Sequence, residues 1–134
     1  MTIAIDSKKL FRVNKNEIFG RPEKPVSDPI MAPAILGVSG MYAGSTFPLT
    51  PNQPVVLGRD GAVAQIVFSQ GAQKISRRHC EVMFNSQTQQ YRVTDFSSNG
   101  TYVNGKRLPA NAPIKLARGT EVSLGDNNNV IKLI

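Results

Sequence analysis

From residue 34 to the end of the chain, apolar residues gather in short runs, and several runs place them at every second position. Cys80, Val82 and Phe84 form one such series, and Tyr91 and Val93 form another. A period of two is that of a β-strand with one buried face. The pattern predicts strands near residues 34–42, 46–50, 55–58, 66–68, 80–84, 91–94, 101–103, 106–108, 114–116, 122–124 and 130–134.

Turn-forming residues separate these runs. Ala43-Gly44-Ser45 and Pro51-Asn52-Gln53-Pro54 break the chain early, and a polar loop covers 69–76. Asn104-Gly105 supplies the positive φ angles that a tight two-residue hairpin turn requires. No helical apolar stripe interrupts residues 34–134. About ten or eleven short strands with turns between them predict an all-β sandwich or barrel.

Residues 1–33 differ from the rest, because charged residues of both signs mix there with prolines at 22, 25, 29 and 33. Such a segment buries little apolar surface, so we interpret 1–33 as an N-terminal tail or linker. Residues 34–134 are expected to form one domain. The segment 1–33 indicates either a tethered domain or a fragment of a larger protein.

The formal net charge of +7 predicts an anionic partner, and the charge alone leaves nucleic acid, acidic lipid and phosphorylated or acidic peptides open. Cys80 is the only cysteine, so neither an intrachain disulfide nor a cysteine-based zinc site can form. The N-terminus lacks the pattern of a signal peptide, and no apolar segment is long enough to span a bilayer. We therefore expect a soluble, cytoplasmic protein.

Three polar loops hold the residues that could bind a ligand. Arg59 follows a predicted strand, and its planar guanidinium could hold two oxygens of a phosphate or carboxylate. Ser76 ends the polar loop and could donate its hydroxyl to an anion. The loop 95–101 is rich in Ser, Asn and Gly, which can hydrogen-bond an extended peptide. Taken alone, each loop is best interpreted as a plain solvated turn. The three could, however, meet at one end of a sandwich and form one site.

Further basic residues flank these loops. Arg77 and Arg78 follow Ser76, and on a strand they would point to opposite sides, so at most one faces the same site as Ser76. Four basic residues around the bound group, Lys74, Arg78, Lys106 and Arg107, would favour acidic residues next to it.

A serine-hydrolase triad is the catalytic alternative, because Ser76, His79 and Asp95 supply one residue of each type. On an extended strand, the spacing of Ser76 and His79 puts their side chains on opposite faces, about 10 Å apart. No Gly-x-Ser-x-Gly elbow surrounds Ser76, and His79 lacks partners with metal-ligand spacing. We expect no catalytic residue and no metal, and interpret His79 as a buried residue that pins one loop against another.

Taken in order, Gly58-Arg59, Ser76-Arg77-Arg78-His79 and Ser98-Asn99-Gly100-Thr101 with Asn104-Gly105 resemble the motifs of the forkhead-associated (FHA) domain. Each piece is weak alone, but together and in this order they are highly specific. The resemblance covers residues 34–134. It implies an eleven-stranded antiparallel β-sandwich that is not an enzyme, has no cofactor, and binds phosphothreonine peptides through loops at one end.

The resemblance also implies a role for each matched residue. Arg59 resembles the phosphate-gripping arginine of the family, Ser76 its phosphate-contacting serine, and Arg77 a position that often adds a phosphate contact. Asn99 resembles the asparagine that bonds the ligand main chain, and Ser98 a position that helps line the phosphothreonine pocket. These five are the predicted phosphopeptide-binding residues.

Three further residues, Gly58, His79 and Gly100, are similar to structural positions that shape the loops. The implied function is phosphorylation-dependent capture of a protein in Ser/Thr kinase signalling, by a monomeric module with no nucleic-acid or membrane partner. One alternative is a phospho-independent assembly module that uses a sheet face. Another is nucleic-acid binding, which the lack of aromatic residues interleaved with the basic ones disfavours.

Overall fold

The structure, a computed structural model, describes residues 32–134, so nearly all of the expected tail at 1–33 lies outside the described residues. The described part contains eleven strands and no helix, and hence no helix that could cross a membrane. The strands are β1 Ala34–Ser39, β2 Thr46–Pro48, β3 Val55–Gly58, β4 Ile66–Val67, β5 Cys80–Asn85, β6 Gln90–Asp95, β7 Thr101–Val103, β8 Lys106–Arg107, β9 Ile114–Leu116, β10 Glu121–Leu124 and β11 Val130–Leu133. The all-β prediction is confirmed.

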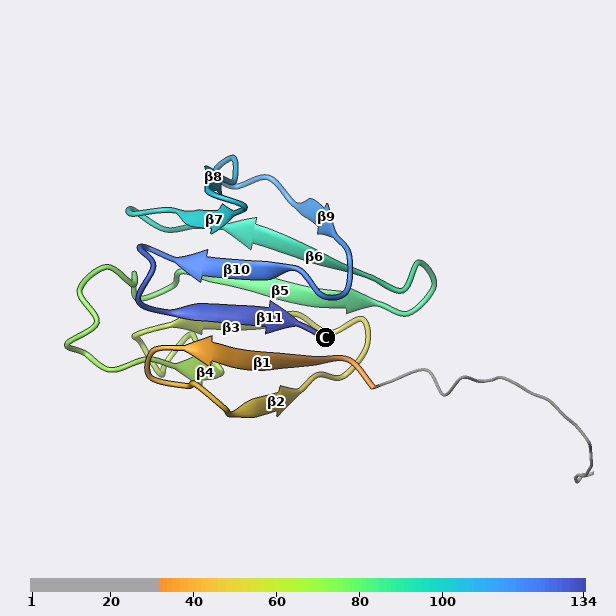
Figure 1. Ribbon diagram of the computed structural model, residues 1–134, viewed down its shortest axis with the longest axis horizontal. Helices are drawn as coiled ribbons and strands as arrows, with labels where there is room; N and C mark the ends of the chain where they lie inside the picture. The colour runs from red at the N-terminus through yellow and green to blue at the C-terminus, as the bar shows by residue number, and fades with distance from the viewer. Residues whose placement is uncertain (1–31) are drawn as a thin grey trace, which may run out of the picture. The chain divides into compact units, whose positions relative to one another are not determined.

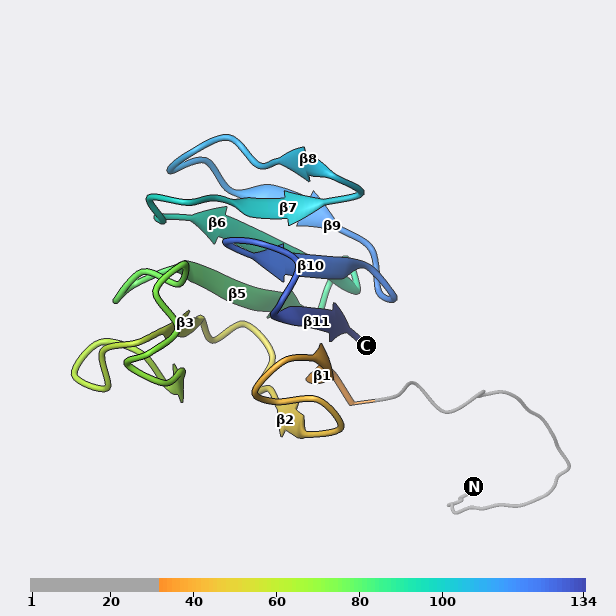
Figure 2. The ribbon, with the colours of Figure 1, turned by 60° about the vertical axis from the view of Figure 1, so that its left-hand side comes forward.

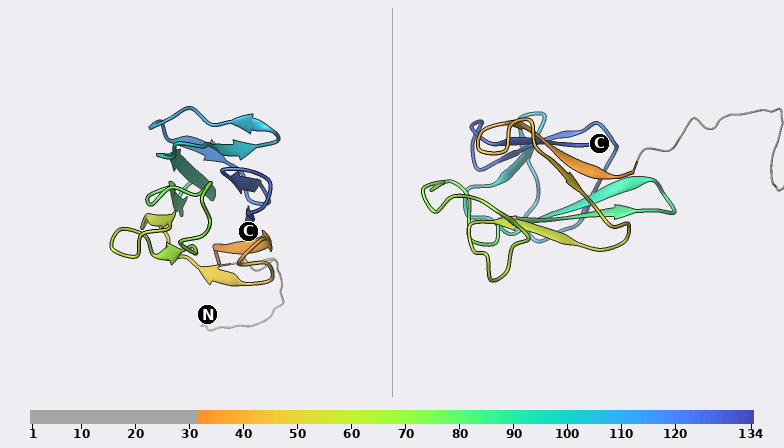
Figure 3. Two further views of the ribbon diagram at one scale, coloured as in Figure 1. Left: turned by 90° about the vertical axis from the view of Figure 1, so that its left-hand side faces the viewer. Right: turned by 90° about the horizontal axis from the view of Figure 1, so that it is seen from below.

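Two sheets pack face to face. The six-stranded sheet has the order β2-β1-β11-β10-β7-β8, and the five-stranded sheet has the order β4-β3-β5-β6-β9. Figure 3 shows the two layers in its right-hand view, and Figure 2 shows β8 and β2 at opposite edges of the first sheet. The eleven-stranded sandwich that the sequence resemblance implied is therefore confirmed.

One pairing differs from a purely antiparallel sandwich. Strands β3 and β4 run parallel, with Leu57 opposite Ile66 and Gly58 opposite Val67. A tight turn makes this possible over a short connection, because Ala64 N donates to the carbonyl of Asp60 at 2.8 Å. The chain thereby returns to the start of β3 and runs alongside it again. The loop that begins at Arg59 is shaped by this turn.

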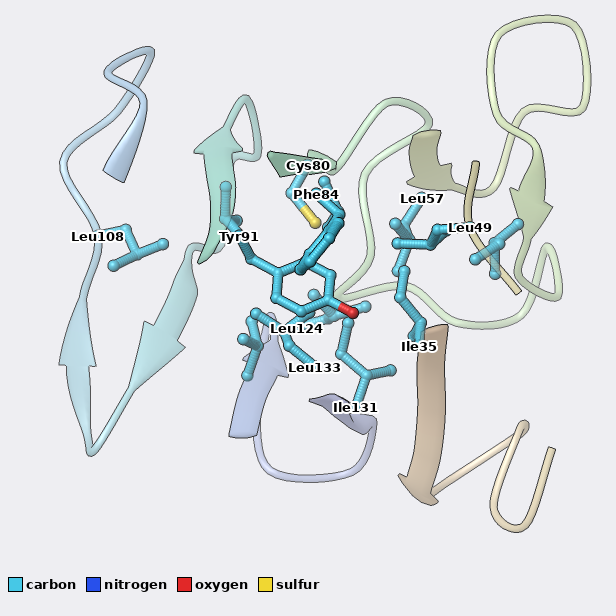
Figure 4. Packing of buried hydrophobic residues seen from close by; sticks show 14 of the residues in the cluster. Ile35, Leu49, Leu57, Cys80, Phe84, Tyr91, Leu108, Leu124, Ile131 and Leu133 are labelled. Carbon is cyan, nitrogen blue, oxygen red and sulfur yellow. The ribbon is translucent and has the colours of Figure 1, made fainter. Parts of the chain in front are cut away.

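The core lies between the two sheets and follows from the alternation of each strand. Strand β5 shows a strict buried–partly buried pattern over its length, and its inward side chains meet those of β10 and β11. Figure 4 shows Phe84 and Tyr91 at the centre, with Leu124 and Leu133 beneath them. Each fully buried aliphatic or aromatic side chain stabilises the fold by about 1.5–3 kcal/mol. This rigid core supports loops that contain little regular structure of their own.

Tyr91 closes one end of the sandwich. Its ring packs against Phe84 with 5.0 Å between centroids, and its hydroxyl lies within hydrogen-bond distance of the backbone of Ala34 and Ile134. The start of β1 and the end of β11 therefore lie together at this end. The loops that follow β3, β6 and β10, and the loop before β5, lie at the opposite end (Figure 1). The loops predicted to carry the site thus share one end.

Candidate functional site

Arg59 follows β3, and the glycine before it allows a close approach of two loops. A Cβ atom on Gly58 would lie 2.0 Å from the carbonyl oxygen of Arg77, which no side chain could tolerate. The backbones meet there: Arg59 N donates to the carbonyl of Ser76 at 3.1 Å, and Asp60 N donates to that of Arg77 at 3.2 Å. Gly58 thus lets the loop after β3 pair with the end of the loop before β5.

The side chain of Arg59 is half-buried and held at two points. Its Nε donates to the carbonyl of Ile75, and its Nη1 lies 3.4 Å from Oε1 of Gln70. Gln70 in turn donates its side-chain N–H to the carbonyl of Arg59 at 2.7 Å. These bonds orient the guanidinium and leave further N–H groups of its fork for a ligand. Gln70 did not emerge from the sequence, because nothing in a polar loop distinguishes it from its neighbours.

Ser76 connects two of the predicted loops. Its Oγ accepts the backbone N–H of Ser98 at 3.1 Å. Because the oxygen is the acceptor in this bond, the hydroxyl hydrogen of Ser76 remains available to donate to another group. The site thus places a hydroxyl donor at the junction of the β4–β5 and β6–β7 loops.

His79 is completely buried and bridges the same two loops. Its Nδ1 accepts the backbone N–H of Ser76 at 3.0 Å, so Nε2 carries the proton and donates to the carbonyl of Gly100 at 2.9 Å. Burial is the main cause that lowers the pKa of His79 from its ordinary value, against opposing effects of the Gly100 carbonyl and the Asp95 charge. The neutral ring therefore links the turn at Ser76 to the loop before β7.

Ser76 and His79 lie next to each other, so their predicted separation of about 10 Å on an extended strand is wrong. Strand β5 begins only at Cys80, and residues 76–79 form a bend that brings Ser76 directly to the His79 ring. The contact uses the backbone N–H of Ser76, however, and not its hydroxyl. The carboxylate of Asp95 bonds Ser97 and Thr101 instead of His79. The three residues therefore do not form the relay of a serine-hydrolase triad.

Asp95 organises the loop that follows β6. Its buried Oδ1 accepts the backbone N–H of Ser97 at 3.1 Å, the hydroxyl of Ser97 at 2.5 Å and that of Thr101 at 2.8 Å. Ser97 Oγ also accepts the N–H of Gly100 at 2.8 Å. This network closes residues 96–100 into a compact loop, with Ser98 and Asn99 at its tip.

Asn99 reaches from this tip to the β4–β5 loop. Its Nδ2 donates to the carbonyl of Lys74 at 3.3 Å, and within residues 32–134 its Oδ1 and second N–H make no hydrogen bond. Ser98 beside it is exposed. The loop tip therefore presents one donor and one acceptor of a side-chain amide next to the Ser76 hydroxyl.

Arg77 and Arg78 precede β5, so the condition for placing them on opposite faces of a strand is not met. Arg78 stacks over the ring of Phe96, 3.8 Å from its centroid, and pairs with Glu81 at 3.5 Å. Arg77 is exposed, and in the described part of the chain its guanidinium contacts no acidic group. Of the two cations, Arg78 is engaged on the outside of the five-stranded sheet and Arg77 is available to a ligand.

A rigid β-sandwich that brings an arginine, a serine and an asparagine together from three loops defines a class of protein: a modular domain that binds through loops at one end. The family model described as FHA domain matches residues 55–125, which is more than half of the chain. The chain belongs to the FHA-domain family, as the sequence resemblance indicated.

Among known proteins, the chain is similar to the E3 ubiquitin-protein ligase rnf8 of Danio rerio, with 44% identity over 62 residues. The match covers 46% of this chain and only 13% of that protein.

Among solved structures, the FHA domain of the CT664 protein from Chlamydia trachomatis has a TM-score of 0.66 at 24% identity, over 76% of this chain and 95% of that one. The N-terminal FHA domain of Rad53p from S. cerevisiae, solved with a phosphothreonine peptide, has a TM-score of 0.60 at 16% identity, over 77% and 91% of the two chains. These likenesses show the shared fold.

Proposed function

We propose that residues 34–134 are a non-catalytic module that binds phosphothreonine peptides and thereby captures a phosphorylated partner protein. The observation that carries the proposal is the convergence of three loops on Ser76. Its carbonyl accepts from Arg59 N at 3.1 Å, and its Oγ accepts from Ser98 N at 3.1 Å. A guanidinium, a hydroxyl and a side-chain amide therefore belong to one site.

The chemistry of this site suits a phosphate monoester. A phosphorylated threonine carries about −1.5 to −2 charges at neutral pH and three acceptor oxygens. Arg59 and the exposed Arg77 offer charge-assisted donors, and the Ser76 hydroxyl adds a neutral one. All three groups donate, which matches a ligand group that only accepts.

The amide of Asn99 suits the peptide next to the phosphate. A peptide main chain offers alternating N–H donors and carbonyl acceptors, and Asn99 has one acceptor and one donor to match them. Ser98 lines the same loop tip. In this proposal Arg59, Ser76 and Arg77 hold the phosphate, while Ser98 and Asn99 hold the residue that carries it.

The proposal extends to the setting in which the module acts. It acts as a monomer in the cytoplasm, downstream of a Ser/Thr kinase, without a cofactor and without a nucleic-acid or membrane partner. Family membership and the phosphothreonine peptide bound to the yeast Rad53p domain support the phosphorylated partner in this setting.

Titration with matched peptides tests the proposal. A library of phosphothreonine peptides is measured by fluorescence anisotropy against the full chain, together with unphosphorylated twins and phosphoserine twins. We expect binding of the phosphothreonine form alone. Arg59→Ala should weaken it by roughly a hundredfold, because two charge-assisted hydrogen bonds are lost.

Arg92→Ala is the matched control. Arg92 is an exposed cation on β6, within the five-stranded sheet and outside the three loops, and its loss removes the same charge. Equal binding of phosphorylated and unphosphorylated twins would contradict the proposal, as would equal effects of the two variants. Capture of a partner that survives Arg59→Ala would favour assembly through a sheet face instead.

A further inference from the structure

The β7–β8 hairpin places two side chains against the loop that carries Asn99. Its two-residue turn, Asn104-Gly105, pairs Tyr102 with Arg107 and Val103 with Lys106. Directly paired residues project from the same face of a sheet, so Tyr102 and Arg107 stand side by side. Lys106 is one residue away and therefore projects from the other face.

The Tyr102–Arg107 pair holds consecutive carbonyl groups of the β6–β7 loop. Tyr102 donates its hydroxyl to the carbonyl of Asn99 at 3.1 Å. Arg107 Nη2 donates to the carbonyl of Ser98 at 3.2 Å and lies 3.5 Å from that of Ser97. Both side chains thus bond the backbone of the two residues predicted to meet the ligand.

Gly100 makes this contact possible. A Cβ atom at Gly100 would lie 2.8 Å from Cε1 of Tyr102 and 2.9 Å from Nε of Arg107. The glycine also has a φ of +99°, an angle that residues with a side chain rarely adopt. The pair therefore packs directly on the loop backbone at the one position without a side chain.

The loop is held from the other direction by the β4–β5 loop. Ser76 Oγ accepts the N–H of Ser98, and the carbonyl of Lys74 accepts from the Asn99 side chain. Ser98 is thus bonded through its N–H on one side and through its carbonyl on the other. The Ser97–Ser98 peptide unit is held through its N–H by Ser76, and the following Ser98–Asn99 unit is held through its carbonyl by Arg107, so both contacts restrict the backbone that directs the Asn99 side chain.

We propose that Arg107, together with Tyr102, is a positioning residue of this site, which fixes the backbone of Ser97–Asn99 so that Asn99 and the Ser76–Ser98 junction are set for a phosphothreonine peptide. The inference rests on the proposed function. Arginine suits the role because its rigid planar fork presents several N–H donors at fixed angles, which a lysine ammonium does not.

A simpler explanation is that Arg107 acts only through its positive charge. Lys106 controls for this, because it lies next to Arg107 on the same two-residue strand, is exposed, and bonds none of the loop carbonyls in the described part of the chain. Lys106→Ala and Arg107→Ala remove the same charge from nearly the same place. Only the second removes the bonds to Ser97 and Ser98.

The first experiment compares these variants by the affinity of the full chain for a phosphothreonine peptide at low and high salt. We expect Lys106→Ala to weaken binding by less than about threefold, with the loss gone at high salt, because exposed charges are screened. Arg107→Ala should weaken binding by about tenfold even at high salt, and by more at low salt, because it removes the same charge in addition to the bonds. Arg107→Lys should give an intermediate loss.

The second experiment is a double-mutant cycle with Asn99→Ala. If Arg107 acts through the loop, the losses from Arg107→Ala and Asn99→Ala are strongly non-additive, whereas those from Lys106→Ala and Asn99→Ala add. Amide NMR shifts should change at residues 97–100 in Arg107→Ala and stay in place in Lys106→Ala. A variant that merely destabilised the whole fold would not give this local pattern.

Each outcome decides the inference. Equal losses with equal salt dependence in the two alanine variants, or additive losses in the cycle, would overturn it and leave the proposed function standing. Failure of the wild-type chain to bind any phosphothreonine peptide would instead remove the proposed function. Should Arg107→Ala not fold, Tyr102→Phe removes one hydroxyl only, and it should weaken binding with shifts at Asn99 and Gly100.

Discussion

At the scale of single residues, the site depends on a side chain that no ligand can reach. His79 is fully buried, yet it holds Ser76 through Nδ1 and Gly100 through Nε2. Both bonds require the neutral ring with its proton on Nε2. The sequence suggested a structural role for this residue because it is the only histidine and has no partner for catalysis. It could not reveal the bond to Ser76, because the spacing argument assumed a strand where the chain bends.

Stability should fall as the pH drops toward 5. The pKa of His79 is lowered in the folded protein, chiefly by burial, so below about pH 6.5 the unfolded chain binds a proton that the folded chain does not. The free energy of unfolding therefore rises with pH in this range, by at most about 1.4 kcal/mol per pH unit for one proton. Urea unfolding at pH 5.5 and pH 7.5 measures the effect.

His79→Gln is the control for this titration. Glutamine offers one acceptor and one donor, as the neutral ring does, and it has no charge to gain. The variant should keep part of the stability and lose the slope between pH 5.5 and 7.5. The same slope in both proteins would show that carboxylates, and not His79, cause the pH dependence.

At the scale of elements, the alternation of apolar and polar residues predicted most of the fold. Every predicted run became a strand, and the longer ones such as β5 and β6 bury one face and leave the other in water. Both residues of β8 are exposed, and the Asn104-Gly105 turn was the signal for that strand. The parallel pairing of β3 and β4 left no such trace, because it depends on a turn bonded through backbone atoms. The residues that contact Arg59 could not be predicted either, because a polar loop has no periodic pattern of apolar residues.

The Tyr102–Arg107 pair is different, since a signal for it was present. Asn-Gly predicts a two-residue turn, and such a turn fixes the register of the strands on both sides. That register alone places Tyr102 opposite Arg107. What the sequence lacks is the direction in which the hairpin packs, and only the folded chain shows that it lies against Ser98 and Asn99.

Gly100→Ala should damage both stability and binding. The substitution adds strain at φ +99° and a clash with the Tyr102–Arg107 pair, and we expect a loss of about 2–4 kcal/mol in the free energy of unfolding. Gly105→Ala separates the two causes, because Gly105 also has a positive φ, +76°, but has no atom within 4 Å of an added Cβ.

The control should cost only about 1 kcal/mol and leave phosphopeptide affinity unchanged. Chemical denaturation gives the stability of both variants, and anisotropy gives the affinity of whatever fraction is folded. Equal stability losses would mean that the backbone angle alone matters and that the contact with the pair is loose.

At the scale of the whole molecule, the buried thiol of Cys80 reports on global unfolding. Burial, with the nearby Asp95 charge, raises the pKa of Cys80 to about 12. At pH 8 the thiolate fraction is then roughly a thousandfold below that of a free cysteine. We expect DTNB to label the native protein only when the core between the sheets opens.

Ligand binding should therefore protect a residue that the ligand never touches. A phosphothreonine peptide at about a hundred times its Kd lowers the unfolded population about a hundredfold, and labelling of Cys80 should slow by a similar factor. Gln87→Cys adds an exposed thiol within the β5–β6 turn, and this thiol should label at once with or without peptide. Labelling of Cys80 at the same fast rate would show that the core opens locally.

The end of the sandwich that Tyr91 closes also determines how the domain unfolds under a mechanical force. Strands β1 and β11 are antiparallel neighbours, and Ala34 N and the carbonyl of Ile134 meet at 3.4 Å where β1 begins and β11 ends. A force applied between residues 34 and 134 would break the backbone hydrogen bonds between these two strands one after another, and not all at once. The sandwich should therefore begin to unfold from this end at low force. The loops around Ser76, at the opposite end, should be the last part on which the force acts.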